Sequence, residues 1–231
     1  ARLLAVSAIL LFFTACASTP PIDTPRGIAT LEKVTLGGLD QWVLIRGRDA
    51  TNPILLYLHG GPGMPAIPFA HAIRDLEKNF VVVMWDQRGA GKSYNAAIPK
   101  ESMTIDRFVA DTRELIMLLL SRFHQKKLYL VGHSWGSILG IMTARDHPEL
   151  LYAYIGVGQV ANMRENERLS YEFVLGKARQ TGNLTAVKEL EAIHPPYRGR
   201  TDELAVQRRW LGQFGGVYYG ASDYTKLINI V

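Results

Sequence analysis

The sequence predicts an α/β protein in which helices flank a mainly parallel sheet and a helical cap follows. Up to Val160, short apolar runs alternate with helix-like stretches, which is typical of βαβ units. Residues 162–214 then hold three helix-like stretches and no convincing strand. We therefore expect a core over residues 28–160 and an incomplete cap over residues 161–231, with the last strands of the sheet missing.

Six apolar runs have the length and composition of strands. The first two flank Gly37-Gly38, a pair that favours a tight turn, and the later runs are short enough to be fully buried strands. The predicted strands are two segments within residues 29–46, followed by residues 54–59, 80–85, 128–131 and 152–158.

Helices are predicted between these strands. Residues 66–78 look helical, a longer helix runs from about Thr104, whose side chain can cap it, to Arg122, and another follows Ser134. The apolar residues of the long helix keep the spacing of one helical face: Ile105, Phe108, Val109, Leu115, Ile116, Leu119 and Phe123.

Three local signals divide the cap into helices. Gly182 can end the first helix-like stretch, and His194-Pro195-Pro196 breaks the second. Thr201, followed by Asp202 and Glu203, opens the third with a cap and an acidic first turn. A helical insertion of this kind, placed after a strand of the sheet, is in the position expected for a lid.

Composition and charge limit the class of protein. The chain is 48% hydrophobic and 20% charged, as globular proteins are, and its formal net charge is +5. No run of Lys and Arg exceeds two residues, so the charge is interpreted as a solvated surface, and no nucleic-acid partner is predicted. The single cysteine excludes an intrachain disulfide framework, and no metal or cofactor site is predicted.

The N-terminal residues resemble a bacterial lipoprotein signal. Arg2 precedes an apolar run from Leu3 to Phe13, which is too short to span a bilayer core of about 30 Å, and small residues surround Cys16. Residues 1–16 are therefore predicted to be a signal segment, with Cys16 lipidated on a membrane surface of the bacterial cell envelope, and residues 17–27 a Pro-rich tether. Ordinary signal cleavage, giving a periplasmic or secreted protein, and a buried apolar helix remain the alternatives.

A serine stands at the centre of the pattern Gly132-His133-Ser134-Trp135-Gly136, between a predicted strand and a predicted helix. G-x-S-x-G marks the nucleophile elbow, a strained turn that projects the serine hydroxyl, and the start of the following helix favours negative charge. The pattern alone also occurs by chance. Its place between strand and helix favours Ser134 as a catalytic nucleophile over a structural turn serine.

The stretch HGGPG, residues 59–63, directly follows a buried strand. Its glycines let the backbone approach a substrate closely, so we expect an oxyanion hole made by one N–H from this loop, at Gly61, and one from Trp135. An ordinary Gly-Pro turn is the alternative. His59 is expected to support the loop, because it follows the wrong strand for a general base.

The stretch WDQRGAGKS, residues 85–93, superficially echoes a phosphate-binding loop. That motif would need glycine where the chain has Asp86, and no helix obviously follows Ser93, so a nucleotide site is rejected. Asp86 and Arg88 are expected to hold this loop beside the active site by hydrogen bonds.

The three motifs, in this order, resemble the α/β-hydrolase fold and, more narrowly, the proline iminopeptidase (prolyl aminopeptidase) group of serine peptidases. The resemblance covers residues 28–160, and covers the cap by position alone. It implies an α/β-hydrolase fold, Ser134 as the nucleophile, and the N–H groups of Gly61 and Trp135 as the oxyanion hole.

Two features depart from that group. His133 stands where these peptidases commonly have glycine, a feature shared with esterases and other hydrolases of the fold. The group also holds the substrate's free amine with cap glutamates, one of them in a Trp-rich helix, whereas residues 208–214 read RRWLGQF with no glutamate. Glu165 and Glu167 lie near the cap entrance, but their local pattern does not match.

The acid and the histidine of a catalytic triad are expected beyond residue 231. In this fold they follow strands after the cap, whereas His194 lies in a Pro-Pro break and His147 ends a helix. The strand before the cap ends in Gly158-Gln159-Val160, without a carboxylate. We expect a shortened chain that is inactive and either poorly soluble or loosely packed by itself, with an unpaired sheet edge at residues 152–158.

The sequence predicts a serine hydrolase that acts by acyl transfer, in the first place an aminopeptidase releasing N-terminal residues, often proline, from short peptides. The second hypothesis is an esterase or lactonase of the same fold, and the third is a non-catalytic binding protein on a hydrolase scaffold. Epoxide hydrolase and dehalogenase chemistry is not favoured, because those enzymes place aspartate where Ser134 stands.

Overall fold

The computed structural model describes residues 20–197 and 201–217, and its centre is a six-stranded sheet in the order β1-β2-β4-β3-β5-β6. β1 pairs with β2, and β2 with β4, in antiparallel fashion, and the remaining pairs are parallel. The mainly parallel sheet is therefore confirmed. The strands are β1 (Ile28–Leu36), β2 (Leu39–Gly47), β3 (Ile54–Leu58), β4 (Val81–Asp86), β5 (Leu128–His133) and β6 (Leu151–Val157).

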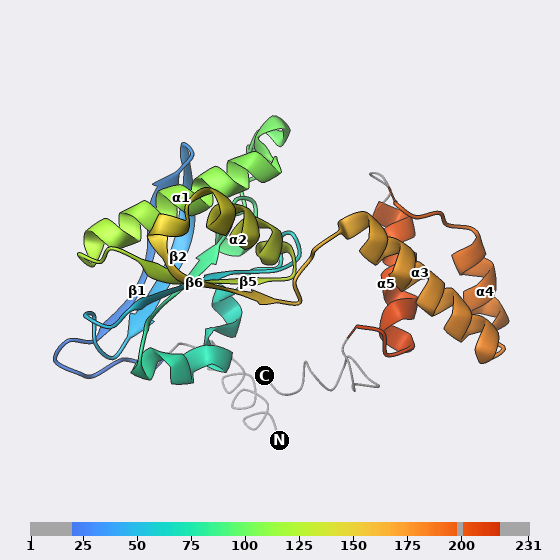
Figure 1. Ribbon diagram of the computed structural model, residues 1–231, viewed down its shortest axis with the longest axis horizontal. Coiled ribbons are helices and arrows are strands. Elements are labelled where there is room, and N and C mark those ends of the chain that lie inside the picture. The colour runs from blue at the N-terminus through green and yellow to red at the C-terminus, as the bar shows by residue number, and fades with distance from the viewer. Residues whose placement is uncertain (1–19, 198–200, 218–231) are drawn as a thin grey trace, which may run out of the picture.

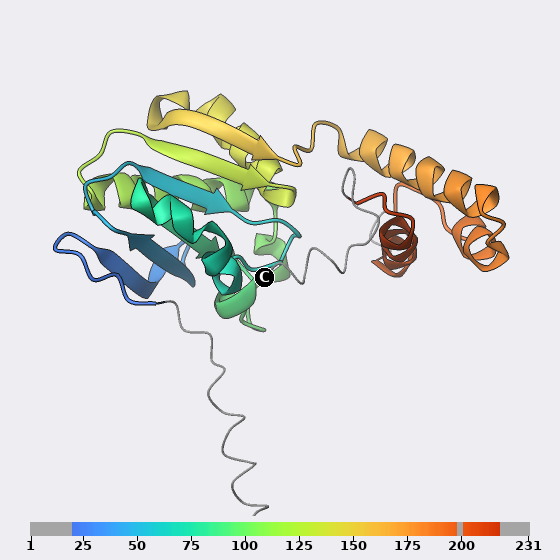
Figure 2. The ribbon, with the colours of Figure 1, turned by 90° about the horizontal axis from the view of Figure 1, so that it is seen from below.

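Helices cover both faces of this sheet (Figures 1 and 2). Side chains alternate along each strand, so neighbouring residues pack on opposite faces. Trp85 lies in the core cluster with Leu115 and Leu139, whereas Met84 lies in a second cluster with Ala70. The helices on the two faces are α1 (Ile105–Arg122) and α2 (Trp135–Asp146) on one and η1 (Ile67–Lys78) on the other.

The predicted helices are present, and one of them differs in type. Thr104 caps α1 by accepting the backbone N–H of Arg107 at 3.2 Å, as its position predicts. Residues 67–78 form a 3₁₀ helix with a kink at Ile73, where φ is −114° and ψ is 16°. Short 3₁₀ turns complete the core: η2 (Gly91–Ser93), η3 (Lys100–Ser102) and η4 (Pro148–Leu150).

The described part of the cap, residues 161–197 and 201–217, contains three helices that pack on one another and join the sheet through residues 158–162 (Figure 1). They share a small apolar core that includes Val174, Ala186 and Trp210. Gly182, with φ of +65°, follows the first of them, as expected for a residue that ends a helix. The helices are α3 (Met163–Gln180), α4 (Leu184–Glu191) and α5 (Thr201–Gln213).

The described part of the segment expected to be a free tether is attached to the sheet. The guanidinium of Arg46 donates to Pro20 O at 2.8 Å, and the Thr24 hydroxyl donates to Arg48 O at 2.6 Å. Pro-rich composition predicts little regular structure but does not prevent such contacts, which here join this segment to β2 and to Arg48, the residue after it. Cys16 and the predicted signal segment lie outside the described residues.

No helix within residues 20–197 and 201–217 is both long and apolar enough to cross a membrane.

Candidate active site

Ser134 occupies the sharp turn between β5 and α2. Its φ is 51° and its ψ is −115°, a left-handed conformation that few residues other than glycine adopt. Its backbone N–H donates to Val157 O at 2.8 Å, and its carbonyl accepts the N–H of Ser137 at 2.9 Å. Strain at a half-buried serine, held by backbone bonds on both sides, is the geometry of a nucleophile elbow.

The two glycines of this elbow are required by close packing. A Cβ atom at Gly136 would lie 2.2 Å from Leu58 O, and one at Gly132 would lie 2.5 Å from Gly136 O. Both obstacles are backbone atoms, which cannot move aside as a flexible side chain could. The elbow therefore packs directly on the end of β3 because residues 132 and 136 lack side chains.

The glycine loop, residues 59–63, lies against the elbow. A Cβ built on Gly60 would lie 3.2 Å from Ser134 Cβ, so the loop backbone passes beside the proposed nucleophile. Gly61 is exposed and has φ of +118°, a conformation that favours glycine. The structure thus brings the loop and Ser134 together, while the role of Gly61 and Trp135 as oxyanion donors stays a prediction.

His59 is buried and bonded through both ring nitrogens. Nε2 accepts the backbone N–H of Gln87 at 3.1 Å, and because a backbone N–H can only donate, Nε2 carries no proton. The proton is on Nδ1, which donates to Gly60 O at 2.8 Å. Burial lowers the pKa of His59, although the Gly60 carbonyl and the Asp86 charge act in the other direction. These contacts favour the predicted role of loop support.

The carboxylate of Asp86 accepts backbone N–H groups from its own loop and from the start of η1. Its carboxylate accepts from the backbone N–H of Lys92 at 2.9 Å and from that of Ile67 at 3.4 Å. Its carbonyl accepts the Ser93 hydroxyl at 2.5 Å. The loop that resembles a phosphate-binding motif is therefore closed around a carboxylate of the chain itself.

Arg88 connects the same loop to helix α1. Its guanidinium donates to both carboxylate oxygens of Asp111, at 2.9 and 3.2 Å, and this pair is almost completely buried. Arg107 donates to the same carboxylate at 2.9 Å. The two arginines offset the cost of burying Asp111, and they hold the loop after β4 on the helical layer.

Two residues of this region were not recognised from the sequence. Gln87 is bonded to His59 and also accepts the indole N–H of Trp135 at 3.2 Å. The Ser137 hydroxyl donates to Ser134 O at 2.6 Å and accepts the backbone N–H of Val160 at 3.0 Å. Both residues lie within or beside recognised motifs, but His59, Trp135 and Val160 are far from them in the chain, so no local signal indicates these contacts.

Comparison with known proteins places this geometry in a family. Residues 53–191, more than half of the chain, match the family described as the alpha/beta hydrolase fold. The chain belongs to the alpha/beta hydrolase family. A solved proline iminopeptidase-related protein from Thermus thermophilus shares the fold, with a TM-score of 0.55 and 23% identity over 88% of this chain and 72% of that chain.

Two sequence relatives are named as peptidases. The chain is 44% identical over 154 residues to the probable aminopeptidase YbaC of Bacillus subtilis, which is 66% of this chain and 48% of the relative. It is 36% identical over 106 residues to the putative proline iminopeptidase of Mycoplasma genitalium, which is 46% of this chain and 32% of that protein. The chain spans about half the length, or less, of these curated relatives.

His147 and His194, which the sequence did not indicate as a general base, lie away from the elbow and in the cap, respectively. His147 follows the 12-residue helix α2, so the rise of about 1.5 Å per residue puts it roughly 18 Å along the helix from Ser134. Its ring pairs with Glu149 at 3.3 Å. His194 is exposed and follows α4 in the cap.

The two glutamates near the cap entrance, Glu165 and Glu167, are paired with arginines. Glu165 is exposed and bonded to Arg168, whereas Glu167 is buried and forms an ion pair with Arg208 of α5. In the described part of the cap, each of these two carboxylates would first have to release its arginine before it could bind a substrate amine.

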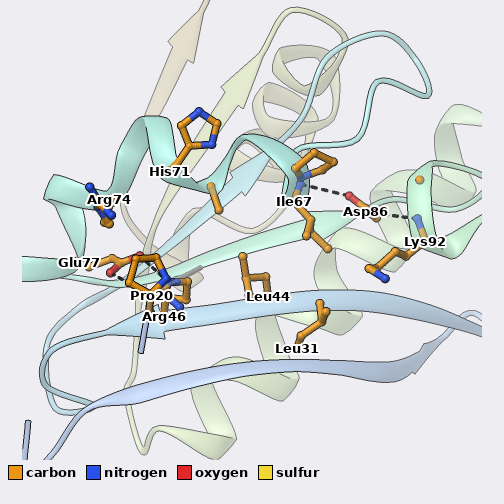
Figure 3. A pocket seen from close by; sticks show the side chains of 13 residues that line it. Pro20, Leu31, Leu44, Arg46, Ile67, His71, Arg74, Glu77, Asp86 and Lys92 are labelled. Carbon is orange, nitrogen blue, oxygen red and sulfur yellow. Dashed lines mark hydrogen bonds and ion pairs between the residues drawn. The ribbon is translucent and has the colours of Figure 1, made fainter. Parts of the chain in front are cut away.

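A cavity of about 620 Å³ lies on the η1 face of the sheet (Figure 3). Its apolar wall includes Leu44 and Ile67, and Arg46 and Lys92 lie towards opposite ends. Neither Ser134 nor the glycine loop lines it. This cavity is therefore distinct from the candidate active site at Ser134.

Proposed function

We propose that the protein is a serine hydrolase that releases N-terminal residues from short peptides by acyl transfer. The observation that carries this proposal is the conformation of Ser134, a non-glycine residue with φ of 51° on the turn from β5 into α2, beside a glycine loop. Its relatives named as an aminopeptidase and a proline iminopeptidase support the peptide substrate.

In the proposed reaction, Ser134 Oγ attacks the carbonyl carbon of the scissile bond while a general base takes the hydroxyl proton. The negative charge that develops on the carbonyl oxygen is stabilised by the N–H groups of Gly61 and Trp135. The amine leaves with a proton, and water then hydrolyses the acyl-enzyme. Both ring nitrogens of His59 are bonded, to Gly60 and Gln87, and His147 lies at the far end of α2, so neither is assigned as the base.

A second candidate is an esterase or lactonase that uses the same elbow. Two observations favour it. His133 replaces the glycine usual in proline iminopeptidases, and Glu167 forms an ion pair with Arg208 instead of being available for a substrate amine. Turnover of a proline arylamide by the full-length gene product supports the aminopeptidase, whereas turnover of short acyl esters alone supports the esterase.

The test of the nucleophile is labelling of the full-length gene product by a fluorophosphonate probe. Ser134→Ala should abolish labelling and lower turnover by about three orders of magnitude or more, because the attacking oxygen is lost. Ser121→Ala, at an exposed serine on α1, is the matched control and should label normally. Labelling that survives in Ser134→Ala would refute the nucleophile, and no labelling of the unchanged protein would favour a non-catalytic binding protein.

We also propose that Cys16 carries lipid that holds the protein on a membrane surface of the bacterial cell envelope. The support is the sequence pattern of residues 1–16. Stable anchoring takes two or more acyl chains. Cys16→Ser should release the protein from the membrane fraction and remove lipid label. The proposal would be contradicted if Cys16→Ser stayed in the membrane fraction and the unsubstituted protein carried no lipid label.

A further inference from the structure

One side chain bridges the two segments that carry the proposed oxyanion donors. Gln87 follows β4 and is 1% exposed. Its backbone N–H donates to His59 Nε2 at 3.1 Å and its side-chain Nε2 donates to His59 O at 3.2 Å. Its Oε1 accepts from Trp135 Nε1 at 3.2 Å. Gln87 thus contacts both the start of the glycine loop and the first residue of α2.

The orientation of this amide is fixed by its partners. The indole N–H of Trp135 can only donate, so it must face the amide oxygen of Gln87. The carbonyl of His59 can only accept, so it must face the amide nitrogen. A flipped amide would lose both bonds inside a buried site, where unpaired polar groups are costly.

The bonds continue to the peptide unit that carries the first proposed donor. His59 donates from Nδ1 to Gly60 O at 2.8 Å. That carbonyl and the Gly61 N–H belong to one planar peptide group, so holding the oxygen also sets the direction of the N–H. On the other side, the Trp135 ring is held by Gln87 and by an edge contact with Phe108, with centroids 5.7 Å apart.

We propose that Gln87 is a positioning residue that sets the two oxyanion-hole N–H groups, those of Gly61 and Trp135, in their working arrangement. This inference rests on the proposed function. Gln87 acts through His59 and Trp135 and does not itself touch the substrate. Negative charge on the oxyanion develops only as Ser134 Oγ bonds to the carbonyl carbon of a substrate, or to the phosphorus of the probe as fluoride leaves. Misplaced donors therefore slow this bond-forming step and leave the initial binding of the probe unchanged.

The chain contains a matched control in Gln41. This residue is also 1% exposed, its Oε1 accepts from Trp85 Nε1 at 3.0 Å, and its Nε2 donates to Leu36 O at 3.2 Å and to Asp111 Oδ2 at 3.0 Å. It thus connects β2 to β1, β4 and α1, and it contacts neither the glycine loop nor the elbow. Replacing Gln41 therefore removes the same kind of buried amide without touching the oxyanion donors.

The experiment measures fluorophosphonate labelling of the full-length gene product at several probe concentrations, which separates the maximal labelling rate from the probe concentration at half-maximal rate. Gln87→Met should lower the maximal rate by about 10- to 100-fold and leave the half-maximal concentration unchanged. Gln41→Met, studied well below its own unfolding temperature, should label at the rate of the unchanged protein.

A second variant keeps the test decisive if Gln87→Met does not fold. Gln87→Glu retains an oxygen for the Trp135 indole, but it can donate to His59 O only when its carboxyl is protonated. Its labelling rate, relative to that of the unchanged protein, should therefore rise as the pH falls from about 8 to about 5. A ratio that does not change with pH would contradict the proposal.

The outcomes separate the inference from the function on which it rests. Normal labelling of Gln87→Met, or equal slowing in Gln87→Met and Gln41→Met, would overturn the positioning role while Ser134-dependent labelling still supports the hydrolase. Labelling that does not depend on Ser134 would overturn the proposed function itself.

Discussion

The nucleophile elbow and the glycine loop lie side by side, yet they use glycine for different physical reasons. In the elbow, a Cβ on Gly136 would lie 2.2 Å from a backbone oxygen of β3. In the loop, Gly63 has no atom within 4 Å of its Cβ position, but its φ is +85°. The first glycine provides space, and the second provides a backbone conformation.

This difference indicates how each segment is held. The elbow is fixed by packing, with β3 beneath it and backbone bonds on both sides of Ser134. Residues 61–64 of the loop are exposed, and the loop is held at its first residue through the bonds between His59 and Gln87. We therefore expect changes in the elbow to affect folding, and changes in the loop to affect catalysis more than stability.

The largest expected effect is that of Gly136→Ala. Its methyl group would overlap Leu58 O and Leu58 C, at 2.2 and 2.7 Å, so the change should cost about 4 kcal/mol or more, or prevent folding. Gly63→Ala meets no atom and should cost only about 1–2 kcal/mol for its positive φ. Denaturant unfolding of both variants measures the difference, and equal stability would show that the elbow is not fixed by packing.

The sequence predicted the elements of the core because their signals are local. Thr104 caps α1, and Leu115 and Leu119 lie on its buried face, as the helical spacing requires. Gly37 and Gly38 both have positive φ in the turn between β1 and β2. Such features depend on residues within a few positions of one another, so pattern and propensity suffice to predict them.

The contacts that organise the site could not be predicted in the same way. Gln87 is 28 residues from His59 and 48 from Trp135, and nothing in the motif shows that these residues meet. The attachment of Pro20 to Arg46 was missed for the same reason, since composition describes the segment and not its partner on β2. Long-range pairing depends on the topology of the sheet, which a single sequence specifies only indirectly.

An intermediate effect is expected at Ser137, which ties the elbow to the start of the cap. Ser137→Ala removes the acceptor of the Val160 N–H and the donor to Ser134 O, which should cost about 1–3 kcal/mol. Thr143→Val, in the same helix, removes a buried hydroxyl that bonds to Leu139 O in its own helix, and should cost less. Hydrogen exchange at Val160 should accelerate in Ser137→Ala alone. Equal acceleration in both variants would mean that α2 is loosened as a whole.

The smallest expected effect concerns the two histidines, one in each segment. Burial lowers the pKa of His59, and it also lowers that of His133, which stacks on Tyr57. Above the ordinary value of 6.5, each imidazole is neutral in both the folded and the unfolded chain. Below that pH, the unfolded chain binds protons that the folded chain does not bind. The free energy of unfolding should therefore decrease as the pH is lowered, by at most about 1.4 kcal/mol per pH unit for each group.

Replacing the two histidines one at a time shows which segment causes this loss of stability at low pH. His59 is 2% exposed and bonded on both ring nitrogens, whereas His133 is only half-buried. Denaturant unfolding between about pH 8 and about pH 5 should give a flatter pH dependence for His59→Gln than for His133→Gln, even though the first variant is less stable overall. If the curve of His59→Gln runs parallel to that of the unchanged protein, the imidazole of the glycine loop is not held neutral. The bond from Gln87 N–H to Nε2 would then not hold in solution, and only the bond from the Gln87 side-chain amide to His59 O would join the loop to Gln87.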